Sequence, residues 1–224
     1  MSIEIWDWGL GYIYLGDVLI AWWGGGSTPR LPSEYQEVEY IETTGTQWIG
    51  TWLFASNNIQ TEVKIEVSTT NMDKPVFWNV APSNVPNSHY YHLTCYQNKW
   101  YCWLNWSETS WWTYNNTIWT QYTIVYNNSN NMLNVNGSDV VSVNGTVWAW
   151  TQLAISYRWW NATYYWQYKY FYFKMYNKTT QQYERDFVPC YRKSDNVIGM
   201  YDLVNNQFYT NAWTWTFTKW ADVN

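Results

Sequence analysis

Tyrosines in strand-like segments are the side chains of this sequence best suited to bind a ligand. Tyr168, Tyr170 and Tyr172 alternate with other residues in the run YKYFYFKMY, so an extended chain would place all three on one face. Tyr96 and Tyr101 lie in two further segments, which are candidates for strands next to this one. Aromatic rings stack on the C–H faces of sugars, and nearby polar side chains bind the hydroxyl groups. These five tyrosines form the candidate ligand-binding site; the alternative is a Tyr-rich outer sheet face without a ligand.

Carboxylates are the second group that could do chemistry, because glycoside hydrolysis uses a pair of them. Glu184 and Asp186 begin an E-x-D-x-x-E pattern similar to that of laminarinase-type hydrolases, but position 189 is proline, so the general acid is missing. Glu62 and Glu66 would share a strand face, where two carboxylates more often serve solvation than catalysis. We therefore expect no catalytic residues and no enzyme, and a glycoside hydrolase is the less favoured alternative.

Histidine and metal chemistry have few candidates. His89 and His92 are the only histidines, and no G-x-S-x-G segment accompanies them, so both are expected at the surface. No D-x-D-x-D-G loop occurs, and Asp73, Asp139 and Asp195 are isolated in the sequence. We expect no cofactor and no metal ligands, with a bound Ca²⁺ as the alternative.

The three cysteines are Cys95, Cys102 and Cys190, and none lies in a C-x-x-C or His-flanked arrangement. An odd number leaves at least one thiol unpaired. We expect buried thiols, with a Cys95–Cys102 bridge across a hairpin as the alternative.

The elements that would position these residues are β-strands. Runs rich in Val, Ile, Thr, Tyr and Trp recur between Asn, Ser and Gly clusters, and no segment sustains a 3.6-residue apolar period. This pattern predicts an all-β, two-sheet antiparallel sandwich. The predicted strands are 3–6, 12–21, 36–42, 60–67, 74–80, 90–96, 100–105, 120–126, 132–135, 152–157, 168–176, 197–202 and 207–209.

Alternation within the 168–176 strand predicts which side chains face the core. Phe171, Phe173 and Met175 are expected to point inward. The outer face would then carry Tyr168, Tyr170, Tyr172 and Tyr176. Two Asn-Gly pairs, at 136–137 and 144–145, predict hairpin turns because both residues tolerate positive φ.

Composition excludes several classes of protein. The net charge is −5 with only 12 Lys and Arg, so no basic stripe is available for nucleic acid. Apolar runs fall short of the roughly 20 residues that span a bilayer, which argues against membrane insertion. A chain with 22 Tyr, 21 Trp and 13% charged residues is not typical of disorder. No Sec-type signal peptide is visible.

The chain is expected to have three parts. Residues 1–23 (with IEIWDWGLGYIYLGDVLI) predict a short β-hairpin leader, and 24–30 have the Gly/Ser composition of a linker. Residues 31–224 form the main domain. We interpret the leader as an attachment element for a homo-oligomer or for virion neighbours.

Two segments that bracket this domain carry a family resemblance. They are LPSEYQEVEYIETTGTQWIGTW at 31–52 and RDFVPCYRKSDNVIGMYDLVNNQFYTNAWTWTFTKW at 185–220. They resemble the first and last strands of concanavalin A-like, laminin G-like jelly-roll domains of phage tail and bacterial surface proteins. The resemblance implies a jelly-roll fold and a non-catalytic, lectin-like module that binds a glycan or host-surface ligand outside the cell, on a cell surface or on a phage virion. A structural virion or surface building block without glycan binding is the alternative.

Tryptophan stands where this family pattern has glycine, at Trp52, Trp213, Trp215 and Trp220. Glycine is absent from 51–136 and from 146–198, although turns and bulges of an all-β chain need it. Our hypothesis is that many of these tryptophans are UGA codons that the source lineage reads as glycine. The alternative is a genuinely Trp-rich protein.

Overall fold

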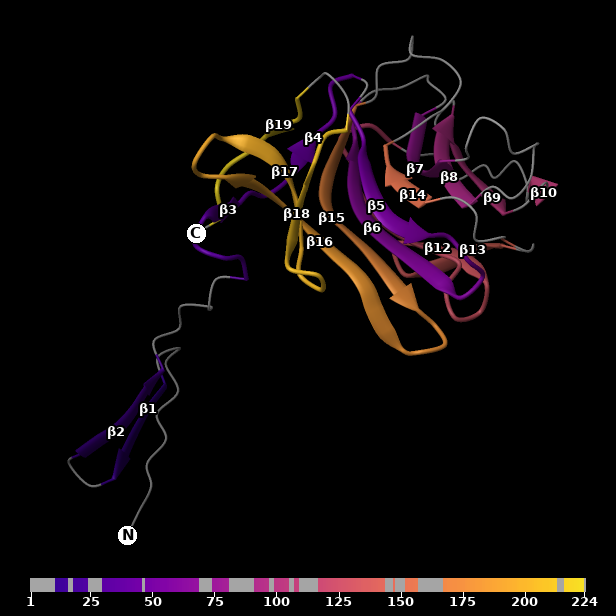
Figure 1. Ribbon diagram of the computed structural model, residues 1–224. Coiled ribbons are helices and arrows are strands. Elements are labelled where there is room, and N and C mark those ends of the chain that lie inside the picture. The colour runs from indigo at the N-terminus through magenta and orange to yellow at the C-terminus, as the bar shows by residue number, and fades with distance from the viewer. Residues whose placement is uncertain are drawn as a thin grey trace. The chain divides into compact units, whose positions relative to one another are not determined.

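The computed structural model describes residues 11–15, 18–23, 30–45, 47–68, 74–80, 91–96, 99–104, 107–108, 117–143, 147, 152–156, 167–212 and 216–223. The chain divides into two compact units, Met1–Pro32 and Ser33–Asn224. All regular elements of the described residues are β-strands, as the sequence predicted (Figure 1). Among these residues no helix is long and apolar enough to cross a membrane.

The first unit contains one β-hairpin. Strands β1 (Gly11–Leu15) and β2 (Val18–Trp23) pair antiparallel. The segment 12–21, predicted as one strand, is thus divided between two. The predicted strand 3–6 and most of the 24–30 linker lie outside the described residues.

The second unit contains two antiparallel sheets. Within the described residues, the smaller sheet has the order β10-β9-β8-β7-β14-β5, and the larger has β13-β12-β11-β6-β15-β16-β17-β18 with β3, β4 and β19 paired beside this path. The strands of the smaller sheet are β5 (Ile49–Phe54), β7 (Lys74–Val80), β8 (Tyr91–Tyr96), β9 (Lys99–Leu104), β10 (Ser107–Glu108) and β14 (Gln152–Ile155). Those of the larger sheet are β3 (Tyr35–Glu37), β4 (Ile41–Glu42), β6 (Ile59–Val67), β11 (Gln121–Tyr126), β12 (Met132–Val135), β13 (Ser138–Ser142), β15 (Tyr168–Asn177), β16 (Gln182–Arg192), β17 (Val197–Asp202), β18 (Gln207–Thr210) and β19 (Thr218–Lys219).

The two sheets share one core, as in a β-sandwich. Phe77 of β7 packs edge-on against Phe173 of β15, with ring centroids 5.8 Å apart, and against Tyr126 of β11 at 5.5 Å. Tyr91 of β8 donates its hydroxyl to the Ile59 carbonyl of β6 at 2.9 Å. Strand β6 alternates strictly between buried and partly exposed residues, because one of its faces meets this core.

Strand β15 departs from the predicted alternation. Tyr170 pairs with Ile65 of β6 and Tyr172 with Lys64, so Phe171 is an extra residue in a β-bulge. The bulge reverses the faces halfway along the strand. Tyr168 and Tyr170 are fully buried, as are Phe173 and Met175 beyond the bulge, whereas Phe171 and Tyr172 are partly exposed. The prediction that Tyr168 and Tyr170 lie on the outer face, with Phe171 in the core, is therefore wrong.

The two segments that bracket the second unit in sequence lie side by side. Strand β3 pairs with β16, and β4 pairs with β19. Trp48 N–H donates to Asn211 Oδ1 at 3.0 Å, and its carbonyl accepts from Ala212 N–H at 3.0 Å. The beginning and end of this unit are consequently joined within one sheet system, where β3, β4, β17, β18 and β19 lie close together (Figure 1).

Turn and cysteine predictions are confirmed where the structure describes them. Asn136 and Gly137 both have positive φ, 51° and 85°, in the turn between β12 and β13. Residues 144–145 lie outside the described part. Cys95, Cys102 and Cys190 are buried thiols, none of them in a disulfide, so the alternative Cys95–Cys102 bridge is not formed.

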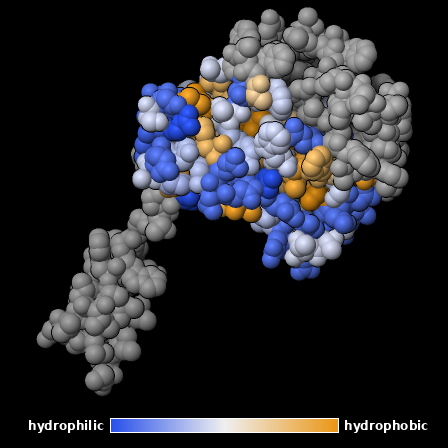
Figure 2. Space-filling view, viewed as in Figure 1, coloured by the Kyte–Doolittle hydropathy of each residue, from blue (hydrophilic) through white to orange (hydrophobic). Residues whose placement is uncertain are grey.

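The visible surface of the second unit mixes polar and apolar side chains. Figure 2 shows its hydrophobic residues in several separate patches between hydrophilic ones. A ligand on this side of the second unit would meet polar and apolar side chains together.

Candidate ligand-binding face

The outward side chains of β6, β15 and β16 form the surface that we call the β6–β15–β16 face. The opposite side of each strand packs against the core, so buried and partly exposed side chains alternate along β6 and, apart from the bulge, along β15. The face combines partly exposed aromatic rings with both signs of charge. Its members are Glu62, Lys64, Glu66, Lys169, Phe171, Tyr172, Lys174, Tyr176, Tyr183 and Asp186.

Lys174 is the centre of one cluster on this face. Its Nζ lies 5.3 Å from the Tyr172 ring centroid and 5.4 Å from that of Tyr183. The same Nζ is 3.5 Å from Asp186 Oδ2 on the neighbouring strand. Tyr183 packs edge-on against Tyr176 with centroids 5.4 Å apart, and 44% of Tyr183 is exposed. A cation, a carboxylate and three rings therefore lie within one side-chain length of each other.

Tyr172 is held at one side of this cluster. Its hydroxyl donates to Glu62 Oε1 at 2.7 Å across the β6–β15 pair. Burial, followed by the hydrogen bond to Glu62 and its charge, raises the pKa of Tyr172 well above its ordinary value. The phenol stays neutral at physiological pH, and its ring is fixed rather than free to rotate away.

A second cluster surrounds Lys169. This residue forms an ion pair with Glu66 at 2.7 Å, and its Nζ lies 4.9 Å from the Tyr40 ring centroid. Burial disfavours the ammonium charge, but the hydrogen bond to Glu66 and its charge outweigh burial, so the pKa of Lys169 is raised. Tyr40 in turn packs against Phe171 at 5.4 Å and stacks on Trp220 at 5.9 Å.

Only one of the five tyrosines predicted to bind ligand lies on this face, namely Tyr172. Tyr168 and Tyr170 belong to the core, and the Tyr170 hydroxyl donates to the Val76 carbonyl of β7 at 2.8 Å. Tyr96 and Tyr101 lie on β8 and β9, which pair with each other in the smaller sheet. The prediction that they flank the 168–176 strand is therefore wrong, and their side chains lie outside the described residues.

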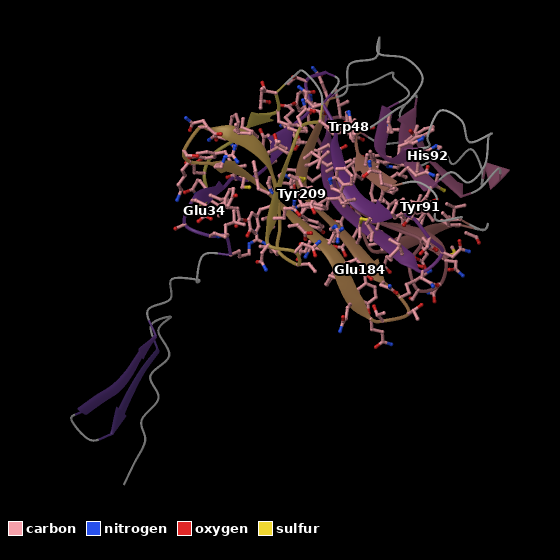
Figure 3. All side chains as sticks on the ribbon, viewed as in Figure 1. Glu34, Trp48, Tyr91, His92, Glu184 and Tyr209 are labelled. Atoms are coloured by element: carbon pink, nitrogen blue, oxygen red, sulfur yellow. The ribbon has the colours of Figure 1, made fainter. Side chains whose placement is uncertain are left out.

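The carboxylates considered for catalysis each have a different partner. Glu62 accepts from Tyr172 and Glu66 pairs with Lys169, and both lie on the same face of β6, as predicted. Glu184 Oε1 accepts from Asn177 Nδ2 at 2.9 Å on the β15–β16 hairpin, where Figure 3 labels it. Asp186 pairs through Oδ2 with Lys174, and its Oδ1 is buried without a hydrogen-bond partner among the described residues.

His92 is buried in the smaller sheet, and its ring stacks on Trp78 at 3.8 Å, so the prediction of a surface position is wrong. The cause is cross-strand pairing, because Trp78 and His92 stand opposite each other on β7 and β8. His89 lies outside the described part. Among the described residues no group of three or more His, Cys, Asp or Glu could hold a metal ion; Ca²⁺ stays a sequence-based alternative.

Sequence reasoning missed Tyr183 and assigned Phe171 to the wrong side. Tyr183 follows the polar segment NKTTQQ directly and is the second residue of β16, which contains proline, and both features obscure the strand pattern. Phe171 points outward because of a β-bulge, and no residue type in the 168–176 run predicts that bulge.

Comparison with protein-family models, with curated proteins and with solved structures finds no significant match for this chain.

Proposed function

We propose that the second unit is a jelly-roll β-sandwich of the concanavalin A-like class and acts as a non-catalytic recognition module for a glycan or host-surface ligand. The observation that carries this proposal is the grouping of Tyr172, Lys174, Tyr183 and Asp186 on one partly exposed sheet face. The side-by-side position of the two bracketing segments supports the fold. Fold alone does not determine function, so the proposal depends on the face.

The chemistry of the Lys174 cluster suits a sugar. A pyranose ring stacks its C–H face on an aromatic side chain, and Tyr183 offers the most exposed ring of the cluster. Lys174 donates hydrogen bonds to hydroxyl or carboxylate oxygens, and Oδ2 of Asp186 accepts from hydroxyl groups. The ligand in this account is a polysaccharide with one sugar ring stacked on Tyr183.

A glycan array followed by affinity electrophoresis tests this proposal. The protein should migrate more slowly in a gel that contains the polysaccharide found on the array. Tyr183→Ala should weaken binding about fivefold, since one aromatic contact contributes roughly 1 kcal/mol. Val204→Ala is the matched control, because Val204 is also an exposed apolar residue but lies at the β17–β18 turn. Absence of retardation by any polysaccharide, with a folded circular dichroism spectrum, would contradict glycan binding.

Catalysis is not part of the proposed function. A hydrolase would release reducing sugar from the bound polysaccharide, and the release would depend on Glu184 and Asp186. We expect no release from the wild-type protein. If the wild-type protein released reducing sugar and Glu184→Gln or Asp186→Asn abolished the release, the protein would be a hydrolase and the proposal of a non-catalytic module would be wrong.

A second candidate function is a structural building block of a virion or surface layer. The observation that favours it is the β1–β2 hairpin, which belongs to a compact unit of its own. Such a hairpin could add to a sheet edge of a neighbouring subunit. Removing residues 1–27 separates the two functions. Loss of assembly with retained sugar binding would assign attachment to the hairpin and recognition to the β6–β15–β16 face.

A further inference from the structure

Trp52 occupies a backbone conformation that suits glycine. Its φ is 56°, in the left-handed region, where a bulky side chain is a genuine outlier. Phe54 of β5 pairs with Gln152 of β14 and Gly50 pairs with Ala154, so three residues of β5 stand opposite one residue of β14. Trp52 is the middle residue of this bulge. Glycine is the usual left-handed residue of β-bulges because it has no Cβ.

The bulge is fixed by contacts that do not involve the indole of Trp52. Thr51 Oγ1 donates to the Leu153 carbonyl at 2.7 Å, and Arg185 Nε donates to the Thr51 carbonyl at 2.9 Å. The indole itself is 69% exposed and makes no ring contact with a described side chain. The fold therefore determines the backbone at position 52 and gains little from the tryptophan side chain.

Trp119 shows the same combination in another part of the chain. Its φ is 62° in the turn before β11, and its N–H donates to the Val67 carbonyl at 2.9 Å. The side chain is 62% exposed, and its ring contact is with Lys169 Nζ at 5.1 Å. Lys169 already pairs with Glu66 and Tyr40, so this exposed contact is a small compensation for a left-handed tryptophan.

The other left-handed positions make the two tryptophans exceptional. Among the described non-glycine residues with positive φ, five are asparagine, which tolerates this conformation, and one each are serine and glutamine. The tryptophans within the core behave differently. Trp100 is 1% exposed, packs edge-on against Tyr122 at 5.5 Å and is not among the positive-φ residues. Position 100 therefore buries the ring of its tryptophan without a left-handed backbone, although the indole Nε1 has no hydrogen-bond partner among the described residues, whereas positions 52 and 119 combine a left-handed backbone with an exposed tryptophan.

We infer that positions 52 and 119 are glycine in the protein as its source makes it, and that UGA codons stand at both positions. UGA is read as glycine by some bacterial lineages and as tryptophan by others, so one gene yields either residue according to the code applied. Trp220 does not share the backbone requirement, since its φ is not positive, and Trp213 and Trp215 lie outside the described residues. The Lys174 cluster contains no tryptophan and is unaffected by this assignment.

Sequencing the gene at these codons and measuring the intact mass of the protein from its natural source test this inference. We expect UGA at positions 52 and 119, UGG at position 100, and a mass that fits glycine at both UGA positions. UGG at position 52 or 119 would overturn the assignment at that position. UGA codons with a mass that fits tryptophan would also overturn it.

The recombinant protein with tryptophan at positions 52 and 119 gives an independent test. Trp52→Gly and Trp119→Gly should each raise the melting temperature by roughly 2–4 °C, because glycine removes the cost of the left-handed conformation. Trp52→Ala is the matched control. Alanine also removes the exposed indole but keeps a Cβ, so the melting temperature of Trp52→Ala should be lower than that of Trp52→Gly. A glycine variant no more stable than Trp52→Ala would overturn the structural argument.

Trp100→Gly controls for a general effect of replacing tryptophan. This change empties a buried volume in the core and should lower the melting temperature by about 10 °C or more. If Trp100→Gly were as stable as the wild type, glycine would be tolerated in place of tryptophan even in the core. The gain at positions 52 and 119 could then not be assigned to their left-handed backbone, and the inference would fail.

Discussion

Strand β15 carries tyrosines on both sides, and the two sets differ in what surrounds them. Tyr168 and Tyr170 lie before the bulge, are fully buried, and in the case of Tyr170 bridge the two sheets through a hydrogen bond to Val76. Tyr172 and Tyr176 lie after the bulge and on the outside, where Tyr172 contacts Lys174 and Glu62. The same residue type therefore stabilises the sandwich on one face and contributes to the proposed binding surface on the other, and the extra residue Phe171 divides the two.

The largest expected effect concerns the buried side of this comparison. Tyr170→Ala should lower the free energy of unfolding by about 3–5 kcal/mol, because it removes a fully buried ring and the hydrogen bond to Val76. Urea denaturation followed by circular dichroism measures the change. A loss below about 1 kcal/mol would mean that Tyr170 is not a core residue.

The ion pair of Lys169 should matter less. Lys169→Met leaves the partly buried Glu66 carboxylate without its cation and should cost about 1–2 kcal/mol at pH 7. Because the pKa of Lys169 is raised, the stabilisation is complete below the ordinary lysine pKa and is lost as the pH rises through the folded-state value. The difference between variant and wild type should therefore shrink at strongly alkaline pH.

Lys219→Met is the matched control for this ion pair, since Lys219 pairs with Asp222 at the surface. It should change stability by less than about 0.5 kcal/mol. Equal losses from the two lysine variants would show that partial burial does not strengthen the Lys169 pair.

Alkaline pH should act on the buried tyrosines. Burial raises the pKa of Tyr170, so the folded state keeps its proton while the unfolded chain ionises near pH 10. The stabilisation is complete below about pH 10 and decreases above it, by at most roughly 1.4 kcal/mol per pH unit for one proton. Tyr170→Phe removes this contribution. Its stability between pH 10 and 11 should fall less steeply than that of the wild type, and parallel slopes in urea denaturation would contradict the account.

The smallest effect on stability is expected on the outer side. Tyr183→Ala should change the free energy of unfolding by no more than about 0.5 kcal/mol, because Tyr183 is an exposed surface residue and lies outside the core, while the substitution weakens glycan binding. Denaturation and affinity electrophoresis of the same preparation measure both quantities. A strongly destabilised variant with unchanged binding would reverse the assignment of the two sides.

Much of the strand content could be predicted from residue type. The bounds of β7, β12 and β17 agree with the predicted 74–80, 132–135 and 197–202 segments, since β-branched and aromatic runs end there at polar turns. Strands β5 and β16 were not predicted. The first contains the glycine-like bulge at Trp52, and the second contains Pro189, which usually argues against a strand inside a sheet.

The candidate site was less predictable than the fold. Period-two alternation assigned the faces of β15 correctly only for the residues after the bulge, because one inserted residue moves every earlier side chain to the opposite face. The pairing of Lys174 with Asp186 and Tyr183 depends on the β15–β16 register, which the sequence does not state. Tyr172 was found because it lies beyond the bulge.

Chemical modification of tyrosines, read by peptide mass spectrometry with and without the retarding polysaccharide, tests the central claim most directly. Nitration under native conditions should modify Tyr183 and leave Tyr168 and Tyr170 unmodified, and the polysaccharide should protect Tyr183. Rapid modification of Tyr168 or Tyr170 in the folded protein would contradict the division of β15 into a buried and a binding side. Equal modification of Tyr183 with and without bound polysaccharide would contradict the β6–β15–β16 face as the binding site.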